Sequence, residues 1–110
     1  MSELLRELDR ILIERKSAPA HESYVASLYS EGLNKILEKI GEESTEVVIA
    51  AKDARGEKGR QDLVNEVADL WFHSLICLAH FDLSSEDVLS VLAKRQGLSG
   101  LVEKASRQQK

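Results

Sequence analysis

Two pairs of acidic residues constrain this chain more than any other feature of its sequence. Glu43 and Glu46 form the first pair, and Glu66 and Asp69 form the second. Residues three positions apart lie on one face of an α-helix, so each pair indicates a helix. The segment between the pairs includes residues 56–59, with a glycine at each end, which allows a tight return. Two antiparallel helices would bring the four carboxylates into one cluster.

Such a cluster predicts a bound cation. Carboxylates that lie close together repel one another unless a cation lies among them. A ligand set made only of anionic oxygens suits a hard divalent ion, so we expect Mg²⁺, with Mn²⁺ as an alternative. A single acidic pair on a helix would more often be a solvated face. Two pairs that border apolar faces and are joined by a turn favour the metal site.

The length and net charge of the chain limit the classes of protein to which it can belong. The chain has 110 residues and a net charge of −4, with no long basic run, which indicates a single domain over residues 1–110 and no nucleic-acid partner. One cysteine excludes a disulfide within the chain and fits a reducing compartment. No apolar stretch reaches the roughly 20 residues of a membrane span. We therefore expect a cytoplasmic protein that binds no membrane.

The apolar spacing predicts an all-α protein, a compact bundle of four to five helices. The chain has one proline and lacks strand-like alternation. Ser23 fits an N-cap, Gly32 a helix end, and Ser84 with Asp87 a capping box. The expected helices lie near residues 3–15, 23–31, 34–54, 61–81 and 85–96, and residues 98–110 are expected to form a partly frayed tail.

The first long helix separates its three glutamates by direction. At 100° per residue, Glu43 falls at the rim of the apolar face and Glu46 further round the same side, whereas Glu42 points roughly opposite the core. Glu43 and Glu46 are therefore the better ligands. Glu42 is expected to be an outer carboxylate that faces the solvent or supports the ligands.

The second long helix predicts self-association. Its apolar residues cover more than half of the circumference, and its main polar gap holds Glu66, Asp69, His73 and His80. Such a helix is expected to be buried on most sides. A second copy of the chain can supply the missing contacts, so we expect a homodimer. His73, four residues after Asp69, suits a ligand, an orienting residue or a substrate contact, and equally a hydrogen-bonded core histidine.

Residues before the acids suggest two further roles. Lys35 and Lys39 lie one helical turn apart, where they can form exposed pairs with nearby glutamates or bind phosphate beside the metal. Gly41 is unfavourable in mid-helix by about 1 kcal/mol relative to alanine. We therefore expect Gly41 to permit a close approach beside the acids.

At the level of motifs, the chain resembles the all-α nucleoside triphosphate pyrophosphatases, the MazG-like superfamily. The resemblance rests on E-E-x-x-E followed by E-x-x-D. Within the superfamily, the detailed match is to the phosphoribosyl-ATP pyrophosphatases of histidine biosynthesis, over about residues 4–104. The matching segments are residues 15–16, 23–28, 32–43, 66–73 and 95–100. One departure is Trp71-Phe72, where the apolar-aromatic pair commonly ends in tyrosine, and it affects packing more than chemistry.

The resemblance implies hydrolysis of phosphoribosyl-ATP to phosphoribosyl-AMP and pyrophosphate. It also implies a monofunctional enzyme, in which Glu43, Glu46, Glu66 and Asp69 hold Mg²⁺ and act in catalysis. The substrate-binding candidates are Lys35, Lys39, His73, Arg95, Ser99 and Gly100.

Three alternatives remain at this level. A house-cleaning nucleoside triphosphate pyrophosphatase would share the fold and the acids, but the terminal R-x-G-x-S-G pattern argues against it. A di-iron bundle usually needs E-x-x-H on two helices, and here Glu66 is followed at that spacing by Asp69. A helical dimerisation module without catalysis would explain the apolar stripes but not the four acids.

Overall fold

The fold is all-α, as predicted. The computed structural model describes residues 2–96, and within them it contains five α-helices, two 3₁₀ turns and no strand. None of these helices is long and apolar enough to cross a membrane. The elements are α1 (Ser2–Glu14), η1 (Arg15–Ser17), η2 (Ala20–Glu22), α2 (Tyr24–Glu31), α3 (Leu33–Lys52), α4 (Gly56–His80) and α5 (Ser85–Arg95).

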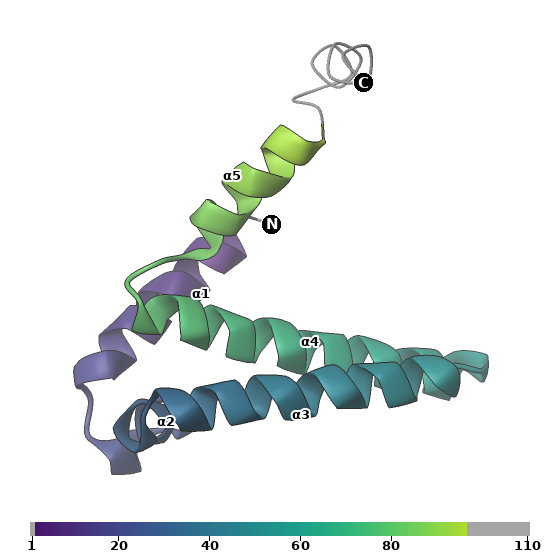
Figure 1. The fold of residues 1–110 in the computed structure, drawn as a ribbon, viewed down its shortest axis with the longest axis horizontal. Coiled ribbons are helices and arrows are strands. Elements are labelled where there is room, and N and C mark those ends of the chain that lie inside the picture. The colour runs from purple at the N-terminus through teal and green to yellow at the C-terminus, as the bar shows by residue number, and fades with distance from the viewer. Residues whose placement is uncertain (1, 97–110) are drawn as a thin grey trace.

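A long antiparallel hairpin of α3 and α4 dominates the shape (Figure 1). Helices α1 and α2 lie at one end of this hairpin, and α5 packs against α1 and points away from the hairpin. We call the end with α1 and α2 the base; it includes residues 33–40 of α3 and 73–80 of α4. The rest of the hairpin, residues 41–72, is the outer arm.

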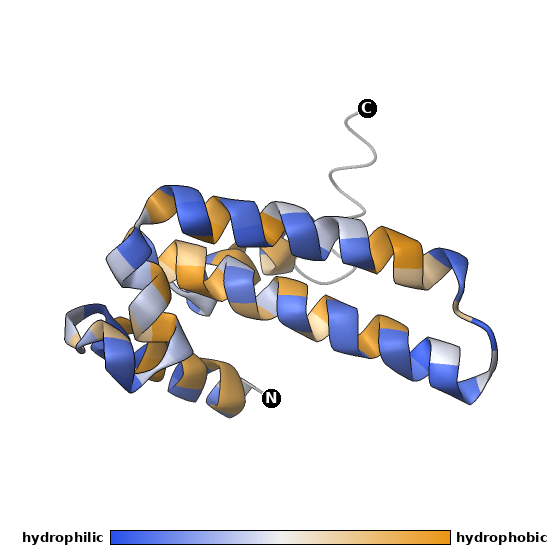
Figure 2. Cartoon of the chain, turned by 90° about the horizontal axis from the view of Figure 1, so that it is seen from below, coloured by the Kyte–Doolittle hydropathy of each residue, from blue (hydrophilic) through white to orange (hydrophobic). Residues whose placement is uncertain are grey.

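The hydrophobic core lies in the base. Its fully buried side chains are Leu12 from α1, Leu28 from α2, Ile36 from α3 and Ile76 from α4. Each of these side chains is buried because its helix turns an apolar stripe toward the others. Apolar residues recur along the whole hairpin (Figure 2). The outer arm nevertheless contains no buried residue.

The predicted helix ends are confirmed where local hydrogen bonds define them. The Ser23 hydroxyl accepts from the Ala26 amide at 3.0 Å at the start of α2. At the start of α5, the Asp87 carboxylate accepts from the Ser84 amide at 2.9 Å, completing the capping box. Gly32 ends α2 with a φ of 101°, a conformation that glycine adopts without strain.

The glycines of the hairpin behave differently from expectation. Helix α4 begins at Gly56, not near residue 61, so residues 56–59 form its first turn. A Cβ atom at Gly59 would lie 2.8 Å from the Asp53 carbonyl oxygen, so glycine is needed for this close return. The expectation for Gly41 is wrong within the chain, because a Cβ atom there would meet nothing within 4 Å.

Two long-range polar contacts join the helices of the base. The Lys16 ammonium donates to the Ala79 carbonyl at 2.9 Å and to the Asp82 carboxylate at 2.8 Å. A cation at this position satisfies the last carbonyl groups of α4 and complements its helix dipole. The Asp9 carboxylate accepts from the Ser85 hydroxyl at 2.6 Å and from the Ser85 amide at 3.0 Å, which joins α1 to the start of α5.

Candidate active site

Three of the four predicted carboxylates come together on the outer arm. Glu43 projects from α3, and Glu66 and Asp69 project from α4. One oxygen of each lies within 4.8 Å of the others. Antiparallel packing of α3 and α4 makes this possible, because it aligns the three-residue spacing of one helix with the facing turn of the other. Among residues 2–96, this is the one group of three acidic, histidine or cysteine side chains with metal-binding spacing.

Glu43 and Glu42 are adjacent in the sequence but lie in different surroundings. The Glu43 side chain is 13% exposed and joins the cluster, whereas the Glu42 side chain is 52% exposed and lies outside the cluster. Glu42 pairs with Lys39 at 3.2 Å. This is the arrangement that the helical wheel predicts, with Glu43 at the rim of the apolar face.

The cluster is electrostatically unfavourable without a cation. Partial removal from water raises the pKa of the Glu66 carboxyl, and the negative charges of Asp69, Glu43 and Glu46 raise it further. A divalent cation among these oxygens would remove the repulsion. The donor set therefore fits a hard metal ion.

Glu46 takes a different position from the other three acids. It is exposed and is not part of the three-carboxylate cluster. It lines a groove of about 360 Å³ that runs from Glu66 toward the tip of the hairpin and also includes Asp62 and Asn65. Its negative charge still acts on Glu66. The ligand role of Glu46 stays a prediction.

His73 is held inside the base. It is 5% exposed, and both of its ring nitrogens have partners within the chain. Nδ1 lies 2.8 Å from the Asp69 carbonyl oxygen, and Nε2 lies 2.7 Å from the Tyr24 hydroxyl. These contacts match the hydrogen-bonded core histidine that the sequence left open. Direct contact with substrate would require one of the two bonds to break.

The contact between Tyr24 and His73 was not predicted from the sequence. Tyr24 follows the N-cap of α2 and meets His73 across 49 positions of sequence. No local periodicity reports such a distant contact. The available signal was the Ser23-Tyr24 segment, which is part of the family resemblance.

The two predicted phosphate-binding lysines border the acids. Lys39 lies 3.9 Å from the Glu43 carboxylate, and Lys35 lies 3.6 Å from Glu38. These are the ion pairs of the simpler interpretation. Lys39 also places an ammonium group beside the carboxylate cluster, where a polyphosphate would need positive charge, whereas Lys35 lies one turn before it on α3.

The remaining substrate-binding candidates are not part of the carboxylate cluster. Arg95 is exposed at the end of α5, on the part of the chain that packs against α1. Ser99 and Gly100, and the predicted frayed tail, lie outside the described residues.

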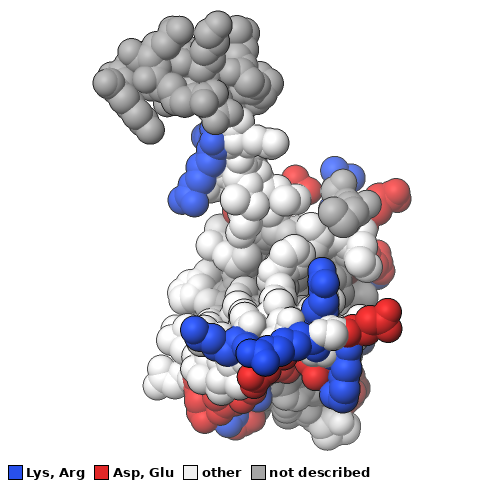
Figure 3. Space-filling model, turned by 90° about the vertical axis from the view of Figure 1, so that its right-hand side faces the viewer, with Lys and Arg blue, Asp and Glu red and all other residues white. Residues whose placement is uncertain are grey.

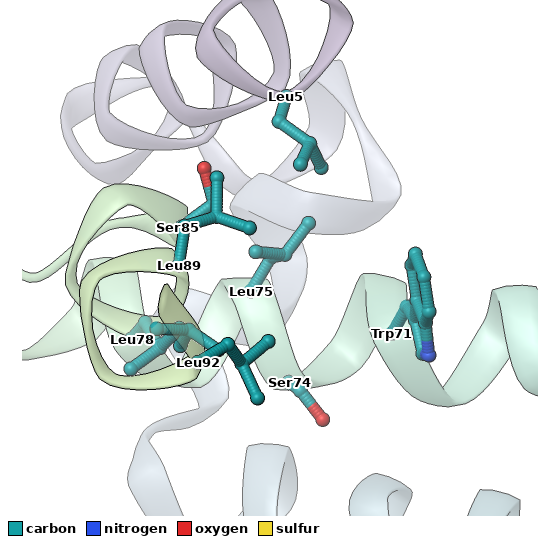
Figure 4. A pocket seen from close by; sticks show the side chains of 9 residues that line it. Leu5, Trp71, Ser74, Leu75, Leu78, Ser85, Leu89 and Leu92 are labelled. Carbon is teal, nitrogen blue, oxygen red and sulfur yellow. The ribbon is translucent and has the colours of Figure 1, made fainter. Parts of the chain in front are cut away.

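Two other surface features differ from the acidic site. Viewed toward the tip of the hairpin, basic and acidic side chains lie next to one another (Figure 3). An apolar groove of about 270 Å³ lies between α1, α4 and α5, with Leu5, Trp71 and Leu92 among its lining residues (Figure 4). Its lining is mostly apolar, with Ser74 and Ser85 as the polar residues, in contrast to the acidic site.

Comparisons with known proteins agree over nearly the whole chain. The model of the family described as phosphoribosyl-ATP pyrophosphohydrolase matches residues 5–96. A curated protein of Hydrogenovibrio crunogenus, named phosphoribosyl-ATP pyrophosphatase, is 57% identical over 106 residues. The alignment covers 96% of this chain and 94% of that protein. The matched region includes every residue of the carboxylate cluster.

Proposed function

Since the chain belongs to the phosphoribosyl-ATP pyrophosphohydrolase family, we propose that it hydrolyses phosphoribosyl-ATP to phosphoribosyl-AMP and pyrophosphate, a step of histidine biosynthesis. The observation that carries this function is the 57% identity to a phosphoribosyl-ATP pyrophosphatase along almost the full length of both chains. The convergence of Glu43, Glu66 and Asp69 supplies a site suited to that chemistry. The cytoplasm is the expected location of such a biosynthetic enzyme.

The cation is expected to be Mg²⁺, with Mn²⁺ as an alternative. Glu43, Glu66 and Asp69 would hold it, with Glu46 as the fourth carboxylate at the mouth of the adjoining groove. Three carboxylate oxygens within 4.8 Å of one another would offer the hard anionic ligands that Mg²⁺ prefers. When bound, the ion neutralises phosphate charge and acidifies a bound water.

The chain's own residues then bind and orient the reactants. A water oxygen attacks a phosphorus of the triphosphate, and the phosphoanhydride bond to the departing pyrophosphate breaks. This reaction needs positive charge around the phosphate oxygens and a correctly placed water. We propose that Lys39, which lies 3.9 Å from Glu43, and Lys35, one turn before it on α3, supply that charge. One carboxylate of the cluster accepts the proton of the attacking water.

The other end of the substrate carries a phosphoribosyl group that ATP lacks. We assign its recognition to Arg95, Ser99 and Gly100. An arginine grips a phosphate with two parallel hydrogen bonds, and a hydroxyl and a backbone amide add further donors. Binding energy from this remote group orients the triphosphate over the acids, so it raises turnover as well as affinity.

The enzyme is proposed to act as a homodimer. Trp71 is 62% exposed, Val64 is 58% exposed and Val48 is 61% exposed, and all three lie on the outer arm. The apolar groove beside Trp71 extends this uncovered surface to α5 (Figure 4). A two-fold partner would cover it. Sedimentation at micromolar concentration is expected to give about twice the 12.3 kDa chain mass, and a fully active monomer would contradict this assembly.

The function is tested by measuring pyrophosphate release from phosphoribosyl-ATP, ATP and other nucleoside triphosphates, each with Mg²⁺ and with a chelator. We expect strong preference for phosphoribosyl-ATP and loss of activity with the chelator. Arg95→Ala should reduce the preference, whereas Lys94→Ala, at the neighbouring position of α5, should retain it. Equal hydrolysis of ATP would instead indicate the house-cleaning pyrophosphatase.

A further inference from the structure

The hydrogen-bond directions at His73 follow from chemistry. The Asp69 carbonyl oxygen can only accept, so the Nδ1 atom 2.8 Å away carries the proton and donates it. In the neutral imidazole, Nε2 is then an acceptor. The Tyr24 hydroxyl, 2.7 Å from Nε2, therefore donates to His73. For the neutral ring, the proton positions along Tyr24–His73–Asp69 therefore follow from the Asp69 carbonyl group.

This chain of bonds joins α2 to the metal-site turn of α4. Tyr24 lies in the first turn of α2, and Asp69 lies one turn before His73 on α4. The His73 ring is held from two sides, since Tyr24 and Phe72 both make edge-on contacts with it at ring-centroid distances of 5.7 Å and 5.6 Å. A ring fixed in this way gives the Asp69 peptide a rigid partner.

Charged groups of the acidic site also act on Tyr24. Its side chain is half-exposed, although its hydroxyl reaches a buried nitrogen. Partial burial raises the pKa of the Tyr24 hydroxyl. The neighbouring charges of Lys39, which lowers it, and of Glu43, which raises it, also act on this group.

We propose that Tyr24 is a positioning residue for the metal site, because it holds His73 against the Asp69 carbonyl and thereby fixes the turn from which the Asp69 carboxylate reaches the cluster. Residues that orient metal ligands from outside the ligand set commonly change metal affinity by about 10–100-fold. Tyr24 acts through one more residue, so a smaller effect is expected. The proposal rests on the proposed metal site.

The test is direct Mn²⁺ binding, measured by electron paramagnetic resonance on the full chain without substrate. Tyr24→Phe removes the hydroxyl and keeps the ring. Tyr29→Phe is the matched control, because the Tyr29 hydroxyl on the same helix donates to the Leu12 carbonyl at 3.0 Å and serves only the base. We expect Tyr24→Phe to weaken Mn²⁺ binding by about three- to tenfold and Tyr29→Phe to leave it unchanged. Urea unfolding of both variants measures the stability that each hydroxyl supplies.

The results distinguish failure of the proposed metal site from failure of the proposed role of Tyr24. If the unmodified protein binds no Mn²⁺, the proposed metal site is wrong. If it binds Mn²⁺ and Tyr24→Phe binds equally well, only the positioning role fails. Equal weakening by both tyrosine variants would also overturn it, because general loosening of the base would then explain the result. A third variant, His73→Phe, should weaken binding at least as much as Tyr24→Phe, and the double variant should weaken it no further.

Discussion

Both halves of the α3–α4 hairpin carry apolar residues at helical spacing, but only the base buries them. Ile36 and Ile76 in the base are 0% exposed, whereas Val48 and Val64 on the outer arm are 61% and 58% exposed. The base is covered by α1 and α2, and the arm extends beyond them. The arm therefore leaves apolar side chains exposed, and it is also the region that holds the carboxylates.

Along the same pair of helices, the base therefore supplies stability and the neighbouring arm supplies the chemical groups. The base supplies a packed core and the hydrogen-bonded Tyr24–His73 pair. The cluster of Glu43, Glu66 and Asp69 lies just beyond that core, where each helix is still oriented by the base but its acids reach solvent. Substitutions in the base should therefore mainly lower stability, whereas substitutions in the cluster should mainly lower activity.

The largest expected effect is on the stability of the base. Ile76→Ala removes a fully buried side chain and should lower the free energy of unfolding by about 2–5 kcal/mol. Val48→Ala, on the exposed arm, should change it by no more than about 0.5 kcal/mol at protein concentrations low enough to keep the proposed dimer dissociated. Urea denaturation of both variants measures this difference. At micromolar concentration the loss for Val48→Ala should be larger, because the proposed partner would then cover this side chain, and a loss that is independent of concentration would contradict that cover.

The next effect is on catalysis. Glu43→Ala removes a proposed metal ligand and should lower kcat by more than about a hundredfold, beyond the range typical of residues that only support ligands. Glu42→Ala, one position away, should have a much smaller effect, because Glu42 lies outside the cluster. Steady-state pyrophosphate release measures both. Circular dichroism should show unchanged helix content, and the opposite order of severity would refute the helical-wheel assignment.

The smallest effect concerns Gly41, where the arm begins. Gly41→Ala should raise the free energy of unfolding by about 0.5–1 kcal/mol, because alanine is the better helix former and its Cβ atom meets nothing within 4 Å. Gly59→Ala should destabilise the protein, since its Cβ atom would lie 2.8 Å from the Asp53 carbonyl oxygen. Thermal unfolding gives both signs. Destabilisation by Gly41→Ala would indicate that a partner packs against this position.

Features set by local chemistry were predictable from the sequence. The caps at Ser23 and Ser84 depend on hydrogen bonds between residues two or three positions apart, so they follow from residue type. The direction of Glu43 follows from helical periodicity. The start of α4 was misplaced, because the glycines at positions 56 and 59 suggested a turn where they in fact allow a helix to begin close to the end of α3.

Features set by the offset between helices were not predictable. Periodicity gives the angle of each acid around its own helix but not how far one helix slides along the other. For this reason the sequence grouped Glu46 with Glu43, Glu66 and Asp69, whereas the structure brings only the carboxylates of the last three within 4.8 Å of one another. The bond between Tyr24 and His73 is missed for the same reason, since it depends on how α2 docks against α4.

The core of the base has a consequence for how the chain acquires its structure during synthesis. Leu12 and Leu28 cannot be fully buried before Ile76 and Ala79 have been synthesised, because all four side chains contribute to the same core. A growing chain therefore exposes the apolar stripes of α1 and α2 until nearly all of α4 has left the ribosome. The bond from Lys16 to the Ala79 carbonyl can form only then. Nascent chains stopped before the end of α4 should consequently remain dependent on chaperones, whereas slightly longer ones can close the base.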